Sequence, residues 1–432
     1  MKNYLNFNCT IDIIENPMDL CIDDFLDIGV RNNKKRRFLF ISKNLGKHLA
    51  VKPSKMDELG KLLVQTYNNR VQASCGTVIA FAETGTGLGH SFFDYLNGDY
   101  EFIHTTREVV SDFKKLEFLE EHSHATDQNL YYENLVKFKS GEEIILVDDE
   151  ITTANTCLNI IKKIQLIYPK KRYTICSILN WVEGKNLEKV EKLENELGCK
   201  IDFVYLFKGK FEFDLDDEKI MELENYEELE VATTLETMNT DVNYINNINL
   251  NVQDPNESLK VEYLSLNMYK YLTSKEYVKY TGRFGIDKED QKRLKEIVKL
   301  ETEKLESECR LERNRYINKR VLFLGTEEFM YIPMLFAKEY EASVDIYYHS
   351  TTRSPIIAID DENYPIKTKK LINSYYNQSI DNFIYNIDIN NFSECFLFVE
   401  LHKSKQDFND FIEVIKNTSI EKLTIVTLNG VR

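Results

Sequence analysis

The sequence contains one tryptophan, and its eight cysteines include no pair in a CxxC spacing. Scattered cysteines of this kind give no sign of a zinc site or a disulfide framework, so we expect buried, reduced thiols. No apolar run reaches the ~18–20 residues of a membrane-spanning helix. The first residues also lack the apolar core of a signal peptide. We therefore expect a cytoplasmic protein with no membrane partner.

The chain also lacks a surplus of basic charge, because 71 acidic residues outnumber 55 basic residues and give a net charge of −16. This balance argues against a broad basic surface for nucleic acid. Hydrophobic residues make up 43% of the chain and charged residues 29%, which is typical of folded globular proteins. A length of 432 residues predicts two or three domains.

Composition divides the chain into three parts. Residues 1–213 alternate short apolar runs with helical stretches. Residues 214–258 are acidic and rich in asparagine, which is typical of a linker or an insertion. Residues 259–432 begin with charged helical patterns and then return to strand–helix alternation. The sequence therefore predicts two α/β domains separated by an acidic segment.

Apolar runs in the first part predict five strands, at 77–82, 101–105, 143–147, 173–179 and 202–207. Helical stretches separate most of these runs, which indicates a parallel sheet covered on both faces. Ligands of such sheets bind at the carboxyl ends of the strands. The residues of interest are therefore those that directly follow each strand.

The strongest functional signal is segment 143–156, Glu-Ile-Ile-Leu-Val-Asp-Asp-Glu-Ile-Thr-Thr-Ala-Asn-Thr. Its apolar strand ends at Asp148 and Asp149, and a turn of small hydroxylated residues at 152–156 leads into a helix. Carboxylates suit the hydroxyl groups of a sugar. Backbone N–H groups and hydroxyls at a helix N-terminus suit a phosphate. Together these groups predict a site for a ribose 5-phosphate.

This segment resembles the phosphoribosyl pyrophosphate (PRPP) motif of type I phosphoribosyltransferases. Segment 82–87, Ala-Glu-Thr-Gly-Thr-Gly, lies where that family has its pyrophosphate-binding loop. Segment 105–108, Thr-Thr-Arg-Glu, lies where the family's mobile catalytic loop begins. Thr152 stands where hypoxanthine-type enzymes carry an acidic base, so the motif is closer to the orotate-type pattern. The resemblance implies the parallel-sheet α/β fold of that family, with PRPP and a base as substrates and Mg²⁺ as cofactor.

The resemblance also implies roles for individual residues, although it identifies no protein ligand for Mg²⁺. The catalytic candidates are Asp148, Asp149, Arg107, His122 and His124. The PRPP-binding candidates are Glu83, Thr84, Gly85, Thr86, Gly87, Glu150, Thr152, Thr153, Ala154, Asn155 and Thr156. The candidates for the base are Lys43 and Trp181.

Several of these assignments have alternatives. His122 and His124 fit a solvated loop, stabilisation of the leaving pyrophosphate, or half of a metal site. Lys43 fits an ordinary surface turn, and Trp181 fits the hydrophobic core. Ala154 stands where the family expects a glycine, and a turn with positive φ there would cost about 1 kcal/mol. Glu150 takes a position that is commonly apolar, which puts phosphate affinity in question.

The second half carries Thr352-Arg-Ser-Pro355, which matches the name-giving motif of the TRSP domain. This domain follows an orotate phosphoribosyltransferase-like domain in proteins of bacterial tellurium-resistance-type stress operons. The residues Glu327, Thr352, Arg353 and Ser354 are candidates for a second, anion-binding site. The alternative is a structural turn in which Arg353 pairs with Glu327 or Glu328.

The second half also echoes the first. Each half has a strand followed by a short loop and a helix, and then a strand followed by Thr-Thr-Arg, at 105–107 and at 351–353. This similarity fits a duplicated Rossmann-like α/β unit that lost its PRPP loop, or chance likeness between two α/β units. A shared strand order is the test of the first explanation.

The expected function is transfer of ribose 5-phosphate from PRPP to a nitrogenous base or related acceptor, making a nucleotide-like metabolite in a stress response. The first alternative is a non-catalytic regulator that senses PRPP or a nucleotide. A second is a nucleotide hydrolase that uses Glu150 as its base. A homodimer is one assembly open to such a chain.

Overall fold

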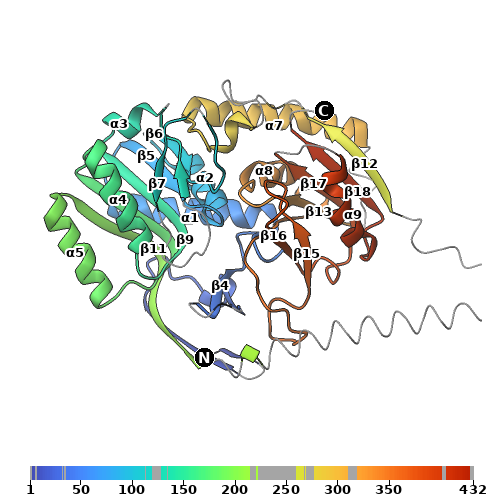
Figure 1. The fold of residues 1–432 in the computed structure, drawn as a ribbon, viewed down its shortest axis with the longest axis horizontal. Helices are drawn as coiled ribbons and strands as arrows, with labels where there is room; N and C mark the ends of the chain where they lie inside the picture. Colours follow the sequence, from blue (N-terminus) through green and yellow to red (C-terminus); the bar gives the residue numbers. More distant parts are fainter. Residues whose placement is uncertain are drawn as a thin grey trace, which may run out of the picture.

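The computed structural model describes residues 2–4, 7–31, 33, 36–111, 113–118, 128–133, 135–214, 220–221, 259–266, 268, 277–309, 319–400 and 405–428. Most of the acidic segment 214–258 therefore lies outside the described residues. Two main sheets lie side by side with helices between them and on their outer faces (Figure 1). Both are built from parallel strands, so the expected α/β class is confirmed for each half.

The first sheet has seven strands in the order β1-β2-β11-β10-β9-β5-β6. Five of them are parallel: β5 (Cys75–Ala80), β6 (Asp99–His104), β9 (Glu143–Ile151), β10 (Arg172–Asn180) and β11 (Lys200–Asp214). The edge strands β2 (Phe7–Glu15) and β1 (Lys2–Tyr4) are antiparallel. The chain runs from β5 outward to β6, returns past β5 to β9 and continues to β11. The strand order therefore reverses between β5 and β9, which is where open α/β sheets bind ligands.

Successive side chains of the central strands enter different cores, as expected for strands covered on both faces. Val78, Ala80 and Val147 pack toward α1 (Pro53–Arg70) and α2 (Gly85–Tyr95). Ile79 and Leu146 pack on the opposite face. That face is covered by α3 (Val136–Ser140), α4 (Asn155–Ile167) and α5 (Lys185–Leu197).

The second sheet has five strands in the order β12-β18-β17-β13-β14. All are parallel: β12 (Lys260–Ser265), β13 (Arg320–Gly325), β14 (Asp345–Ser350), β17 (Phe392–Val399) and β18 (Lys422–Thr427). The order β14-β13-β17-β18 is the order of β6-β5-β9-β10 in the first sheet. The position of β11 is taken by β12, which precedes the other strands along the chain. The echo between the halves thus passes the test of a shared strand order.

The two halves share one hydrophobic core. A single cluster of buried side chains extends from Val147 in the first sheet through Met56 and Met334 to Phe323 and Phe398 in the second. The helices in this layer are α1, α2, α8 (Tyr331–Tyr340) and α7 (Lys288–Cys309), which runs along one side of both sheets in Figure 1. The outer face of the second sheet is covered by α9 (Asn409–Lys416). Burial of one core by both halves ties their relative position to the hydrophobic effect.

Three smaller pairs of strands complete the fold. They are β3 (Leu26–Val30) with β4 (Phe38–Ser42), β7 (Leu116–Phe118) with β8 (Gln128–Leu130), and β15 (Lys369–Asn373) with β16 (Asp381–Tyr385). Isolated bridges join Arg31 to Ile356 and Val51 to Tyr348, so the segments around β3 and before α1 touch the second half. Among the described residues, no helix combines the length and the apolar character needed to cross a membrane.

Gly60 sets how closely α1 approaches α2. A Cβ at this position would lie 2.6 Å from the carbonyl carbon of Ser91 and 2.7 Å from the nitrogen of Phe92. We expect Gly60→Ala to lower the free energy of unfolding by about 1–3 kcal/mol, because backbone atoms of α2 would have to move. In an exposed helix the same change stabilises by about 0.5–1 kcal/mol. Urea denaturation measures the sign, and Lys61→Ala, at an exposed neighbour, is the control. A stabilised Gly60→Ala variant would contradict the close approach.

Candidate functional site

A cavity of about 530 Å³ opens at the carboxyl edge of the first sheet. It forms because β5 ends at Ala80, which pairs with Val147, while β9 and β10 continue beyond that point. Asp148 and Asp149 are thus the first residues of β9 that have lost their β5 neighbour. The cavity is lined by Arg31, Asn33, Arg36, Leu39, Ala82, Glu83, Thr84, Arg107, Asp148, Asp149, Glu150, Ile151, Thr152, Thr153, Ala154, Asn155, Thr156, Cys157, Arg353, Ser354 and Pro355.

The turn 152–156 forms one end of the cavity and begins helix α4 at Asn155. Ala154 precedes the helix with φ 62° and ψ 3°, the left-handed conformation expected from the family's glycine. Thr153 supports the turn, since its Oγ1 accepts a hydrogen bond from the Asn155 amide at 3.3 Å. The first N–H groups of a helix have no partner within the helix, so this end of the cavity suits an anion.

Glu150 forms an ion pair with Arg36 inside the cavity wall. The Arg36 Nη2 donates to both carboxylate oxygens of Glu150, at 2.6 and 2.5 Å, and the Glu150 side chain is 5% exposed. The pair explains how a carboxylate occupies a position that is commonly apolar. It also weighs against Glu150 as the base of a hydrolase, because both oxygens already accept hydrogen bonds from a cation.

Arg31 is a second cation in the same wall, and it has no carboxylate within ion-pair distance among the described residues. Among the described residues, its guanidinium donates a long hydrogen bond of 3.4 Å to the carbonyl of Arg36, and its Nε has no partner. Burial, reinforced by the neighbouring Arg36, lowers the pKa of Arg31 to about 10. A half-buried cation of this kind is stabilised when an anion binds beside it.

The acidic side of the cavity is balanced by a buried lysine. Lys47, 1% exposed, forms an ion pair with Glu83 and donates to the carbonyls of Glu327 and Thr351, both at 2.8 Å. Burial raises the pKa of Asp149, while Arg36 and Lys47 act in the opposite direction. Among the described residues, no group of three or more His, Cys, Asp or Glu side chains is placed to hold a metal ion.

Comparison with protein families identifies both halves. Residues 25–210 match the family described as phosphoribosyl transferase. Residues 280–415 match the TRSP domain, which lies C-terminal to that transferase domain. The chain therefore combines a phosphoribosyl transferase domain with a TRSP domain that follows it. No curated protein matches the sequence.

Solved structures with some likeness to the chain include adenine phosphoribosyltransferases. The enzyme from Trypanosoma brucei, in complex with AMP, pyrophosphate and ribose-5-phosphate, is 15% identical with a TM-score of 0.32, over 43% of this chain and 76% of its own. The Giardia lamblia enzyme complexed with 9-deazaadenine is 14% identical with a TM-score of 0.30, over 42% and 92%. The Rhodothermus marinus enzyme is 11% identical with a TM-score of 0.29, over 43% and 95%. At these scores the likeness supports no argument about the substrate.

The pyrophosphate-loop candidates divide between the cavity and the core. Glu83 and Thr84 line the cavity, whereas Gly85, Thr86 and Gly87 lie in the first turn of α2 and do not. A Cβ at Gly85 would lie 3.0 Å from Asp148 Oδ1, and one at Gly87 would collide with Met56. Gly85 and Gly87 therefore bring α2 close to β9 and α1.

The TRSP motif contributes to the wall of the transferase cavity. Arg353 and Ser354 line it together with Asp148 and Arg107, so the structure places them in one cavity where the sequence suggested two. The Arg353 Nε donates to Glu327 Oε2 at 2.5 Å, as the structural alternative expected. Arg353 also lies 3.6 Å from Glu108 of the transferase domain. Arg353 therefore forms the salt bridge and also lines the cavity, and its binding of an anion stays a prediction.

Other candidates lie elsewhere. Thr352 is buried and pairs with Phe383 of β16. Lys43 is at the surface, where it donates to the carbonyl of Asp23, and Trp181 packs against Phe40 in the core. Neither lines the cavity, and their assignment to the base stays a prediction. His122 and His124 lie outside the described residues.

Three site residues escaped the sequence interpretation: Arg31, Arg36 and Lys47. Arg31 and Arg36 flank a basic run between two short strands, and such a run is usually solvated. Lys47 follows Lys43 in a turn that gives no sign of burial. The sequence signal for these cations was Glu150, a carboxylate at a position that is commonly apolar. A buried carboxylate requires a cation nearby.

The left-handed conformation of Ala154 in the turn 152–156 lowers the free energy of unfolding. A left-handed conformation costs an L-residue about 1–2 kcal/mol, which glycine would not lose. Glycine also makes the unfolded chain more flexible, and this offsets about 0.4–1 kcal/mol of that gain in stability. We expect Ala154→Gly to raise the free energy of unfolding by about 0.5–1 kcal/mol, measured by urea denaturation. The control is Ala337→Gly in α8, a right-handed position where we expect a loss of about 1 kcal/mol. Equal losses in both variants would count against strain at Ala154.

Proposed function

We propose that the chain transfers ribose 5-phosphate from PRPP to a nitrogen nucleophile. The observation that carries this proposal is the cavity at the strand reversal, where Asp148 and Asp149 lie beside the turn 152–156. The turn binds the 5-phosphate at the N-terminus of α4. The two carboxylates accept hydrogen bonds from the ribose hydroxyls and thereby orient the sugar.

The pyrophosphate lies at the side of the cavity formed by Glu83, Thr84 and Arg107. The acceptor nitrogen forms a bond to C1 of the ribose as the bond from C1 to the pyrophosphate oxygen breaks. The electron pair leaves with pyrophosphate, and the proton of the nitrogen passes to water. Arg107 stabilises the charge that grows on the leaving oxygen.

Mg²⁺ fits this site as an ion carried by the substrate. Asp148 and Asp149 are carboxylates that line the cavity. Phosphate oxygens of PRPP would supply further oxygen ligands of the kind that Mg²⁺ prefers. When bound, the ion offsets part of the pyrophosphate charge. We assign residues 1–213 to the transferase domain, 214–258 to the segment between the domains and 259–432 to the TRSP domain.

The double variant Asp148→Asn and Asp149→Asn tests the site directly. We expect it to lower PRPP affinity at least 100-fold with an unchanged melting temperature, because both carboxylates face a ligand and lie outside the packed core. Isothermal titration calorimetry with Mg·PRPP measures the loss. The control is Asp360→Asn with Asp361→Asn, an acidic pair that does not line the cavity.

Wild-type affinity in the folded double variant would refute the site. PRPP binding without pyrophosphate release, across a panel of nitrogen bases, would favour the non-catalytic sensor over the transferase.

Arg31 supports a finer proposal, that the acceptor carries an acidic group. In this arrangement the sugar and its 5-phosphate lie against Asp148, Asp149 and the turn 152–156. The wall formed by Arg31, Asn33 and Leu39 is left for the acceptor. An acceptor anion would supply the ion-pair partner that Arg31 lacks among the described residues. With a neutral base, the charge of this half-buried cation would be offset in part by Glu150, which is already paired with Arg36.

We expect Arg31→Gln to lower kcat/KM for acidic acceptors at least 30-fold while PRPP affinity changes less than threefold. The assay is pyrophosphate release with heterocycles that carry a carboxylate and with their uncharged analogues. Arg37→Gln, at a neighbouring arginine that does not line the cavity, is the control. Preference of the wild-type protein for neutral bases would contradict the role, as would an equal loss of PRPP affinity.

A further inference from the structure

The TRSP domain repeats the architecture of the transferase domain. Beyond the shared strand order, each domain has an antiparallel strand pair after one of two corresponding parallel strands, β7 with β8 after β6 and β15 with β16 after β14. In each, the residue two positions past that parallel strand bridges to the pair, Thr106 to Asn129 and Thr352 to Phe383. The loops after β5 and β6 therefore correspond to those after β13 and β14.

The corresponding edge of the TRSP domain is filled by its own side chains. Arg283, 1% exposed, donates to Glu328 Oε2 at 2.6 Å and to Glu400 Oε2 at 2.7 Å. Tyr376 donates to the same Glu400 oxygen at 2.9 Å. Glu328 and Glu400 follow β13 and β17, the counterparts of β5 and β9, so Arg283 occupies the place that a ligand takes in the transferase domain.

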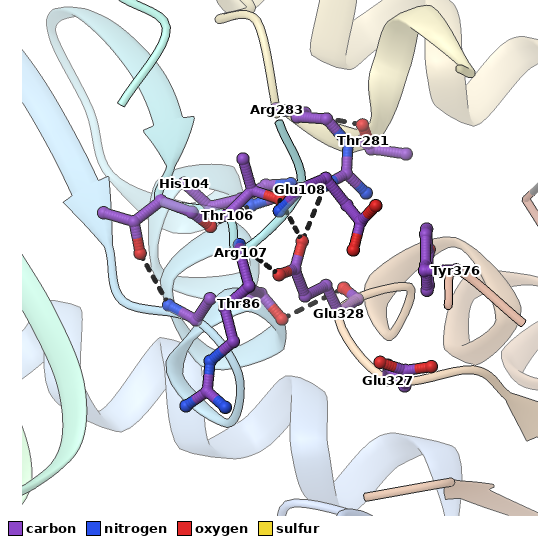
Figure 2. A network of polar contacts seen from close by, with 12 residues as sticks. Thr86, His104, Thr106, Arg107, Glu108, Thr281, Arg283, Glu327, Glu328 and Tyr376 are labelled. Carbon is purple, nitrogen blue, oxygen red and sulfur yellow. Dashed lines mark hydrogen bonds and ion pairs between the residues drawn. The ribbon is translucent and has the colours of Figure 1, made fainter. Parts of the chain in front are cut away.

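Glu328 uses its remaining hydrogen-bonding capacity on the transferase domain (Figure 2). Its Oε2 accepts from Thr106 Oγ1 at 2.6 Å, and its Oε1 accepts from the backbone amide of Arg107 at 2.9 Å. Its carbonyl accepts from Thr86 Oγ1 at 3.1 Å. Glu328 of the TRSP domain thus contacts the segments of the transferase domain that follow β5 and β6. These two segments form the side of the cavity that we assign to pyrophosphate.

The contact with Glu328 is made by the backbone amide of Arg107 and not by its side chain. In Figure 2 the Arg107 guanidinium points away from the Glu328 carboxylate, and Arg107 lines the cavity. Burial alone would raise the pKa of Glu328, but Arg283, His104 and the hydrogen bonds from Thr106 and Arg107 lower it to about 2. Glu328 is therefore a fixed anion, and hydrogen bonds to a buried anion are strong and directional.

We propose that Glu328 is a positioning residue for pyrophosphate binding, through which the TRSP domain acts as a built-in partner of the transferase domain. It fixes the loop that begins at Thr105, so that the Arg107 guanidinium meets the pyrophosphate without ordering the loop at each turnover. The inference rests on the proposed function, because it assumes that the cavity binds PRPP.

The test separates the two ends of PRPP by calorimetry with ribose 5-phosphate, with Mg·pyrophosphate and with Mg·PRPP. We expect Glu328→Gln to weaken pyrophosphate and PRPP at least tenfold and to change ribose 5-phosphate less than twofold. The matched control is Glu341→Gln, another carboxylate between the domains, which accepts from the Ser54 amide at 2.9 Å but does not line the cavity. We expect it to leave all three affinities unchanged.

A second variant covers the case in which Glu328→Gln fails to fold, since it removes a charge partner of Arg283. Thr106→Val keeps the Arg283–Glu328 ion pair and removes the hydrogen bonds of the Thr106 hydroxyl, which donates to Glu328 Oε2 and accepts from Arg283 Nη1 and from the Glu108 amide. We expect it to show the same selective loss for pyrophosphate.

Unchanged affinities in the folded variants would overturn the positioning role while leaving the transferase proposal intact. An equal loss for ribose 5-phosphate would also overturn it, since it would indicate a general structural effect. A wild-type protein that binds neither PRPP nor ribose 5-phosphate would remove the proposed function and this inference together.

Discussion

Contact between the carboxyl edges of two parallel sheets is the constraint on which the site depends. A parallel sheet collects at one edge the loops that follow its strands. Here the loops after β5 and β6 touch the loops after β13 and β14, through Glu328, Arg353 and Lys47. The shared core of α1, α2 and α8 holds the sheets in this relation. The cavity therefore has walls from both domains.

Local charge in the cavity differs from the charge of the whole chain. The protein has a net charge of −16, yet four arginines line the cavity: Arg31, Arg36, Arg107 and Arg353. Their pairing differs, because Arg36 neutralises Glu150 and Arg353 neutralises Glu327, whereas Arg31 has no such partner in the part of the chain that the structure describes. Net charge governs solubility and long-range attraction, and the pairing of individual buried charges governs which ligand the site accepts.

The two domains put the same topology to different uses. The transferase domain leaves the edge between β5 and β9 open, with Asp148 and Asp149 facing the cavity. The TRSP domain fills its equivalent edge with Arg283. A site closed by internal ion pairs is rigid, and a rigid surface suits the support of a neighbouring loop. The fold alone therefore does not decide function, which follows from the side chains at the edge.

The sequence by itself determined what depends on neighbouring residues. Apolar runs predicted the central strands β5, β6, β9, β10 and β11, because burial on both faces demands continuous apolar segments. The carboxylate pair, which lies within β9, and the turn that follows it also followed from local chemistry. The left-handed conformation of Ala154 followed from the glycine that the resembling family has at this position. Helix α2 was harder to predict, since Gly85, Gly87 and Gly89 have low helix propensity and tertiary packing overrides it.

The tertiary structure decided which distant residues share the cavity. Arg353 lies more than 200 residues from Asp148 along the chain, yet both line one cavity, where the sequence suggested a second site. The same holds for Lys47, which reaches Glu83 and Glu327, and for Glu328, which holds the backbone of Arg107. Such contacts leave no periodic mark in the sequence, because a single buried charge chooses its partner by the packing of whole sheets and not by its neighbours in the chain.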